Sequence, residues 1–206
     1  MGKQLSIKQN NLDKLPGFEV MYRGKMFEII NFVGQSNTKF EVAVRAPGTR
    51  LIIETEKDGQ KALLMTKEIR REVEGYDFRL PGGKVFDSLE QFDLSKKNED
   101  DMSLMVKNAA EKEGKEEAGI RGGAYEYLGV SKDGASVEWD LHYFKVTNAE
   151  FGEQELEGYE QGNIEIIILS AKEIFEKLSR REIQEGRSAD ILWFWLQQNG
   201  FLNFKE

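Results

Sequence analysis

The segment AAEKEGKEEAGI, at residues 109–120, carries a dense group of acidic side chains. Its charged residues are Glu111, Lys112, Glu113, Lys115, Glu116 and Glu117. On an α-helix, residues three and four apart share a face, so we expect Glu113 beside Glu116 and Glu117. Like charges at that spacing destabilise a helix by roughly 0.2–0.5 kcal/mol per pair. A divalent cation reverses this effect because it binds carboxylate oxygens. Two interpretations stay open: a solvated charged face that the lysines neutralise, and a metal site.

The composition narrows the classes of protein and of site. The 206 residues are 39% hydrophobic and 32% charged, a balance typical of one or two folded domains. With no cysteine and one histidine, His142, the chain lacks thiolate and histidine-rich metal sites. The net charge of −8 argues against nucleic acid as a partner. No apolar run reaches the roughly 20 residues of a membrane helix, and no secretory leader is visible, so we expect a cytoplasmic protein without a membrane partner.

The pattern along the chain predicts a mixed sheet with helices. Extended segments are expected at 17–48, 76–86, 124–132, 136–146 and 163–170, with a hairpin at 49–69 around KDGQ. Helices are expected at 104–118, 171–183 and 188–201. The polar stretches 87–103 and 148–162 are interpreted as surface loops. Strands before and after a central helix, followed by more helices, indicate an α/β or α+β sandwich.

The acidic helix follows a strand and a Pro-Gly-Gly turn at residues 81–83. This strand–turn–loop–helix order resembles the Nudix hydrolase family, whose box reads G-x5-E-x7-R-E-U-x-E-E-x-G-U, where U is a bulky aliphatic residue. Gly83 matches the opening glycine. The second half of the box is matched in register by Glu113, Glu116, Glu117, Gly119 and Ile120.

The match to the box is incomplete. Lys112 replaces the box arginine, which keeps the charge and loses the forked donor. Gly114 replaces the first aliphatic residue, and Leu89 stands where the first glutamate is expected. The spacing to Lys112 is longer than in the family, so residues 88–103 are interpreted as an insertion. These changes leave the second group of glutamates in place.

The resemblance extends over most of residues 20–200. YRGKMFEI and FEVAVRAPGTRLIIE are similar to the N-terminal strands of the ADP-ribose pyrophosphatase-type subgroup, and LLMTKEIRREVEGYDFRLPGGKV resembles its passage into the box. The resemblance implies a Nudix α/β/α sandwich with a mixed sheet and an N-terminal β-strand extension. It divides the chain into an extension at 1–45, which forms a homodimer, and a Nudix domain at 46–206.

The resemblance also implies the residues of a site. Mg²⁺ or Mn²⁺ would be held by Glu113, Glu116, Glu117 and the carbonyl of Gly82. Catalytic roles would fall to Glu116 and to a base from the acidic loop, with Glu160 preferred over Glu157. Arg70 and Gly83 would contact the substrate.

The implied reaction is hydrolysis of the pyrophosphate bond of a nucleoside diphosphate sugar such as ADP-ribose, giving a nucleoside monophosphate and a sugar phosphate. Two alternatives stay open. One is a Nudix enzyme that acts on dinucleoside polyphosphates or nucleotide cofactors. The other is a catalytically inactive Nudix-fold module that binds a nucleotide, which the changes at Lys112 and Gly114 favour.

Overall fold

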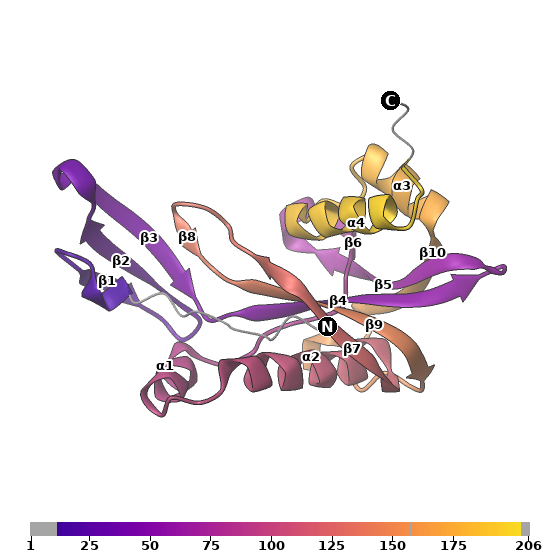
Figure 1. Cartoon of the computed structure of the whole chain (residues 1–206), viewed down its shortest axis with the longest axis horizontal. Helices are drawn as coiled ribbons and strands as arrows, with labels where there is room; N and C mark the ends of the chain where they lie inside the picture. The colour runs from indigo at the N-terminus through magenta and orange to yellow at the C-terminus, as the bar shows by residue number, and fades with distance from the viewer. Residues whose placement is uncertain (1–11, 157, 203–206) are drawn as a thin grey trace. The chain divides into compact units, whose positions relative to one another are not determined.

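The computed structural model describes residues 12–156 and 158–202, and in them the chain has a mixed α+β fold (Figure 1). The strands are β1 (Glu19–Arg23), β2 (Phe27–Val33), β3 (Lys39–Arg45), β4 (Gly48–Lys57), β5 (Gln60–Arg70), β6 (Gly75–Arg79), β7 (Ile120–Ser131), β8 (Val137–Glu138), β9 (Leu141–Phe151) and β10 (Ile164–Ser170). The α-helices are α1 (Leu89–Lys97), α2 (Met102–Ala118), α3 (Ala171–Ser179) and α4 (Gly186–Gln198). The predicted fold class is confirmed.

The chain divides into two compact units, each built from separated segments. Unit 1 comprises the described parts of Met1–Thr49, Gly83–Ala110 and Tyr127–Tyr143. Unit 2 comprises the described parts of Arg50–Gly82, Glu111–Glu126 and Phe144–Glu206. The predicted division into an extension at 1–45 and a domain at 46–206 stays a prediction.

Unit 1 contains a four-stranded sheet with the order β1-β2-β3-β8. The strands β1, β2 and β3 are antiparallel neighbours, and β8 pairs in parallel with β3. The expectation of a surface loop over 87–103 is wrong, because this segment forms α1 and the start of α2. The hydroxyl of Ser88 accepts a hydrogen bond from the Gln91 N–H at 3.2 Å, which is the N-cap that starts the helix. Because the segment is rich in polar residues, the sequence analysis interpreted it as a loop and did not recognise Ser88 as an N-cap.

Unit 2 contains the predicted hairpin. Asp58 and Gly59 both have positive φ, at 53° and 73°, as a two-residue turn between antiparallel strands requires. The strands β4 and β5 pair from Ile53–Leu64 to the turn, and β5 also pairs with β10 and β6. The full order of this six-stranded sheet is β10-β5-β4-β9-β7, with β6 beside β5.

The helix α2 confirms the expectation for 104–118. Asp101 caps its start, since the side-chain oxygen accepts the N–H of Ser103 at 2.9 Å. Gly119 follows its end with φ at +65°, the left-handed conformation in which helices often stop. A methyl group at Gly119 would lie 2.4 Å from the Gly152 carbonyl oxygen. The helix therefore ends at a fixed point beside the loop that follows β9.

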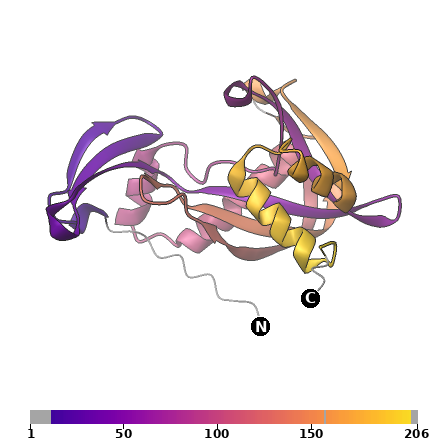
Figure 2. The ribbon, with the colours of Figure 1, turned by 90° about the horizontal axis from the view of Figure 1, so that it is seen from above.

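The helices α3 and α4 pack against each other, and α3 also contacts β10 and β5 (Figures 1 and 2). A capping box starts α3, because Ser170 and Glu173 exchange hydrogen bonds between side chain and backbone. In the part of the chain that the structure describes, no helix has the length and apolar character needed to cross a bilayer.

Candidate active site

The acidic end of α2 is divided between solvent and the interior. Glu111, Lys112 and Lys115 are exposed, as the solvated-face interpretation expects. Glu117 is only 7% exposed and shares the buried side of the helix with Gly114 and Ala118. A carboxylate at a buried helix position needs compensating donors or cations. The solvated-face interpretation is therefore excluded for Glu117.

The Pro-Gly-Gly turn lies directly against this carboxylate. The N–H of Gly82 donates to Oε2 of Glu117 at 2.7 Å. The carbonyl oxygen of the same residue accepts a hydrogen bond from Nη1 of Arg50 at 2.8 Å. Gly82 has φ at +142°, a conformation that favours glycine. The turn is thus held between a carboxylate and a guanidinium group through one residue.

Burial and like charge raise the pKa values of two of the three glutamates. Burial, and then the charge of Glu116, raise the pKa of Glu113 to about 7, and Glu160 acts in the same direction. Burial, followed by the charge of Glu113, raises the pKa of Glu117 to about 8. Ordinary carboxyl groups titrate near 4.5. The side chains are therefore close enough to repel one another, as the helix spacing predicts.

This donor set fits a hard divalent cation. Mg²⁺ and Mn²⁺ prefer carboxylate and carbonyl oxygens, and burial together with neighbouring carboxylates raises the pKa values of Glu113 and Glu117 despite the nearby charge of Arg50. Within residues 12–156 and 158–202, however, no three His, Cys, Asp or Glu side chains are already gathered closely enough to hold a metal ion. The structure brings Glu113, Glu117 and Gly82 to one place and leaves the ligand set incomplete.

Arg50 is a member of this cluster that the sequence analysis missed. It is 7% exposed at the start of β4, and its Nε lies 4.0 Å from Oε2 of Glu185. Its charge lowers the pKa values of Glu113 and Glu117, against the larger opposite effects of burial. The signal was present in TRLIIE, because an arginine that leads directly into an apolar strand must find a buried anion or acceptor.

Arg70 lies at the end of β5 and forms an ion pair with the buried carboxylate of Glu68. Glu68 also accepts the hydroxyl hydrogen of Thr66 at 2.5 Å, and its charge contributes to the raised pKa of Glu117. The Nε atom of Arg70 is buried and has no hydrogen-bond partner among the described residues. The arginine is therefore oriented on one side and keeps one donor for another group.

The acidic loop after β9 is tied to the end of α2. The carbonyls of Glu116, Glu117 and Gly119 accept hydrogen bonds from Glu155 N, Gln154 Nε2 and Gly152 N, at 2.9, 2.6 and 2.7 Å. These contacts satisfy carbonyls that a helix end leaves without intrahelical partners. Glu160 follows in a short 3-10 helix, Gly158–Glu160, and its charge reaches Glu113. Glu157 lies outside the described residues.

Gly114 and Gly83 have local structural roles that the box pattern did not predict. A methyl group at Gly114 would lie 2.5 Å from the Tyr125 hydroxyl oxygen and 3.1 Å from Cδ1 of Leu51. The space that the box assigns to an aliphatic side chain is thus taken by Tyr125. The carbonyl of Gly83 accepts the N–H of Thr49 at 2.9 Å, so this predicted substrate-binding residue belongs to unit 1 and pairs with backbone there.

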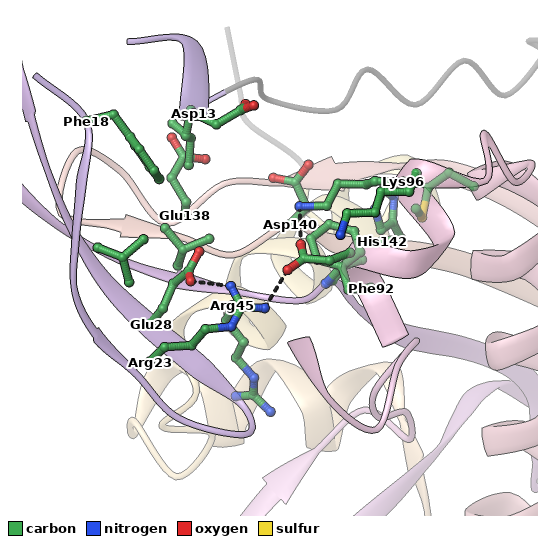
Figure 3. A pocket seen from close by; sticks show the side chains of 17 residues that line it. Asp13, Phe18, Arg23, Glu28, Arg45, Phe92, Lys96, Glu138, Asp140 and His142 are labelled. Carbon is green, nitrogen blue, oxygen red and sulfur yellow. Dashed lines mark hydrogen bonds and ion pairs between the residues drawn. The ribbon is translucent and has the colours of Figure 1, made fainter. Parts of the chain in front are cut away.

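A separate cavity of about 460 Å³ lies within unit 1 (Figure 3). Arg23 of β1 and Glu28 of β2 lie on one side of it, and Phe92 and Lys96 of α1 lie on the other. Four of its charged side chains form ion pairs: Arg23 contacts Glu28 at 2.6 Å and also Asp93, and Asp93 contacts Lys96 at 2.7 Å. Burial acts to raise the pKa of Asp93, but hydrogen bonds from Lys96 and Arg23 outweigh it and lower that pKa.

The fold and the cluster define a mixed α+β protein with a glutamate-bearing helix held against a Pro-Gly-Gly turn. No protein-family model matches the chain, and no curated protein matches it. A solved structure described as an ADP compounds hydrolase is similar, with a TM-score of 0.62 and 17% sequence identity. The similarity covers 94% of this chain and 100% of that chain. At this identity the similarity shows the fold alone.

Proposed function

We propose that the protein hydrolyses the pyrophosphate bond of a nucleoside diphosphate sugar such as ADP-ribose, with Mg²⁺ or Mn²⁺ at Glu113, Glu116 and Glu117. One observation carries this proposal: buried, mutually repelling carboxylates on α2 lie beside the glycine turn, with pKa values raised to about 7 and about 8. A structural cluster would be paired with cations, whereas a cluster that awaits a divalent ion would not. The similar fold of an ADP compounds hydrolase supports the substrate class.

The residues of this chain would divide the work as follows. Glu113, Glu116 and Glu117 would hold a divalent ion, which would neutralise the charge of a diphosphate and lower the pKa of a bound water molecule. The N–H of Gly82 fixes one oxygen of Glu117, so that the other oxygen is presented in a defined direction. The carboxylate of Glu160 would accept the proton of the attacking water, and the guanidinium of Arg70, whose side chain is 34% exposed, would donate to the diphosphate.

A homodimer is part of the proposal. The strand β1 lies at the edge of its sheet and is exposed along its length. Val20, Met21 and Tyr22 are 43%, 55% and 57% exposed. An edge strand with apolar side chains pairs readily with another chain. Light scattering at micromolar concentration should give the mass of a dimer, and Met21→Lys should shift it toward the monomer. A monomeric mass for the wild-type protein would contradict the predicted homodimer.

The test of function is a panel of nucleoside diphosphate sugars, dinucleoside polyphosphates and nucleotide cofactors, each with Mg²⁺, Mn²⁺ or a chelator. We expect monophosphate release from a nucleoside diphosphate sugar, and loss of that release with chelator. Turnover that chelator leaves unchanged would contradict the proposal. Turnover confined to dinucleoside polyphosphates would change the proposed substrate class and would still support the proposed metal site.

A second function is favoured by a specific observation. The carboxylates are not gathered into a three-ligand set, and Arg50 already holds the Gly82 carbonyl. These features suit a module that binds a nucleotide without cleaving it. Micromolar binding of ADP-ribose by calorimetry, with no product under any metal, would support this module and exclude the enzyme.

A further inference from the structure

The turn residue Gly82 has both of its backbone polar groups engaged by side chains of opposite charge. Its N–H donates to Glu117 at 2.7 Å, and its carbonyl oxygen accepts from Arg50 at 2.8 Å. The two residues, Arg50 and Glu117, are each 7% exposed. Arginine stays protonated in proteins, so this buried contact holds a permanent positive charge beside the Gly82 carbonyl. The family resemblance implies that the same carbonyl is a ligand of a metal ion.

The surroundings of Arg50 hold more negative charge than one arginine balances. Arg50 also forms an ion pair with Glu185, at 4.0 Å. The Glu185 carboxylate already accepts hydrogen bonds from the N–H and hydroxyl of Ser188 at the start of α4. A guanidinium in this position attracts the α2 carboxylates and repels a cation that approaches the same oxygen.

We propose that Arg50 is an internal cation of the carboxylate site: its guanidinium holds the Gly82 carbonyl oxygen against a divalent ion, so the wild-type protein binds one divalent ion fewer than the Arg50→Met variant. The remaining ions bind to carboxylate oxygens of α2. Arg50 is therefore a positioning residue that keeps the turn in place and supplies part of the charge which a further metal ion would otherwise bring. This inference rests on the proposed metal site and does not depend on the identity of the substrate.

The experiment counts bound Mn²⁺ without any turnover. Metal-free wild-type protein and Arg50→Met are titrated with Mn²⁺ at neutral pH, and free Mn²⁺ is measured by electron paramagnetic resonance. We expect the variant to bind one Mn²⁺ more than the wild type. Equal numbers would overturn the proposal, whatever the change in affinity, and so would the absence of bound Mn²⁺ in both proteins.

The matched control is Lys112→Met. The Lys112 ammonium lies 3.4 Å from Oε2 of Glu116, and its side chain is 60% exposed. This substitution removes one positive charge that, like Arg50, acts on Glu113, and it leaves the Arg50 contact in place. We expect tighter Mn²⁺ binding and the wild-type number of ions. A number that rises as in Arg50→Met would show that net charge alone sets the count, and would overturn the role of Arg50 at the carbonyl.

Removal of a buried arginine risks misfolding, so a second measurement uses the wild-type protein. Anomalous scattering from crystals grown with Mn²⁺ should place the ions on carboxylate oxygens of α2, with Arg50 still on the Gly82 carbonyl. An ion coordinated by that carbonyl would overturn the proposal. Failure of the proposed function is distinguishable: a higher ion number in Arg50→Met without turnover of any substrate removes the hydrolase and leaves this inference standing.

Discussion

Each unit contains a group of charged residues, and the carboxyl pKa values are shifted in opposite directions in the two groups. In the unit 1 cavity, Asp93 lies between Arg23 and Lys96, and its pKa is lowered. At the end of α2, Glu113 and Glu117 lie beside other carboxylates, and their pKa values are raised to about 7 and about 8. In the first group, cations of the protein itself already neutralise the carboxylate. In the second group, burial and like charge keep protons on the carboxyl groups near neutral pH, and a divalent cation can displace these protons.

The largest expected difference between the two groups is in activity. Glu117→Gln should lower Mg²⁺-dependent turnover by at least about a hundredfold, because a ligand of the ion is lost. The same change should raise the melting temperature of the metal-free protein, since the cost of burying an ionisable carboxyl group beside Glu113 disappears. Asp93→Asn should leave turnover unchanged. Equal activity of Glu117→Gln and wild type would contradict the proposed role of Glu117 as a ligand of the ion.

The next difference concerns pH. Glu113 and Glu117 titrate at about 7 and about 8 when folded and near 4.5 when free. Between these values the folded state binds more protons than the unfolded state, so stability is highest below pH 4.5 for these groups and falls as pH rises toward 8. Melting temperatures of metal-free protein should therefore fall over this range, and Mg²⁺ should restore more stability at pH 8 than at pH 5.5. A Mg²⁺ effect independent of pH would contradict the assignment.

The cavity acid should act on stability alone. Asp93→Asn removes the charge that receives Arg23 and Lys96, and should lower the free energy of unfolding by about 1 kcal/mol. Urea denaturation of the metal-free protein measures this directly. Because the pKa of Asp93 is lowered, its contribution is present above the ordinary pKa and is lost as pH falls through the folded value. If Asp93→Asn stabilised the protein, the ion pairs of Asp93 with Arg23 and Lys96 would not contribute to the stability of the folded state.

The smallest effect tests how the carboxylate helix is packed. Gly114→Ala should destabilise the protein by about 1 kcal/mol, because the new methyl group meets the Tyr125 hydroxyl, which lies 2.5 Å away in the wild type. In a Tyr125→Phe background the same change should stabilise by up to about 1 kcal/mol, since alanine favours helix over glycine. Thermal denaturation of the four proteins gives the coupling. Identical effects in both backgrounds would exclude this contact.

The sequence predicted the fold class, the hairpin at Asp58 and Gly59 and the helix before Gly119, because local turn and cap signals agree with the hydrophobic pattern there. It missed α1, whose apolar content is low and whose start depends on the Ser88 cap. It did not predict Arg50 in the site, because the contact with Gly82 joins residues 32 positions apart. The position of Tyr125 beside Gly114 was not predicted either, because the packing of α2 against the following strand β7 leaves no periodic signal.

The central claim, that the end of α2 is held ready for a divalent ion, is tested most directly by calorimetric titration with Mg²⁺ at pH 7 in two buffers of different ionisation enthalpy. Binding of the ion must displace the protons that Glu113 and Glu117 carry, so we expect release of about one proton per wild-type chain and none from the Glu113→Gln/Glu117→Gln double variant. Mg²⁺ binding to the wild type without proton release, or equal release from both proteins, would contradict the account.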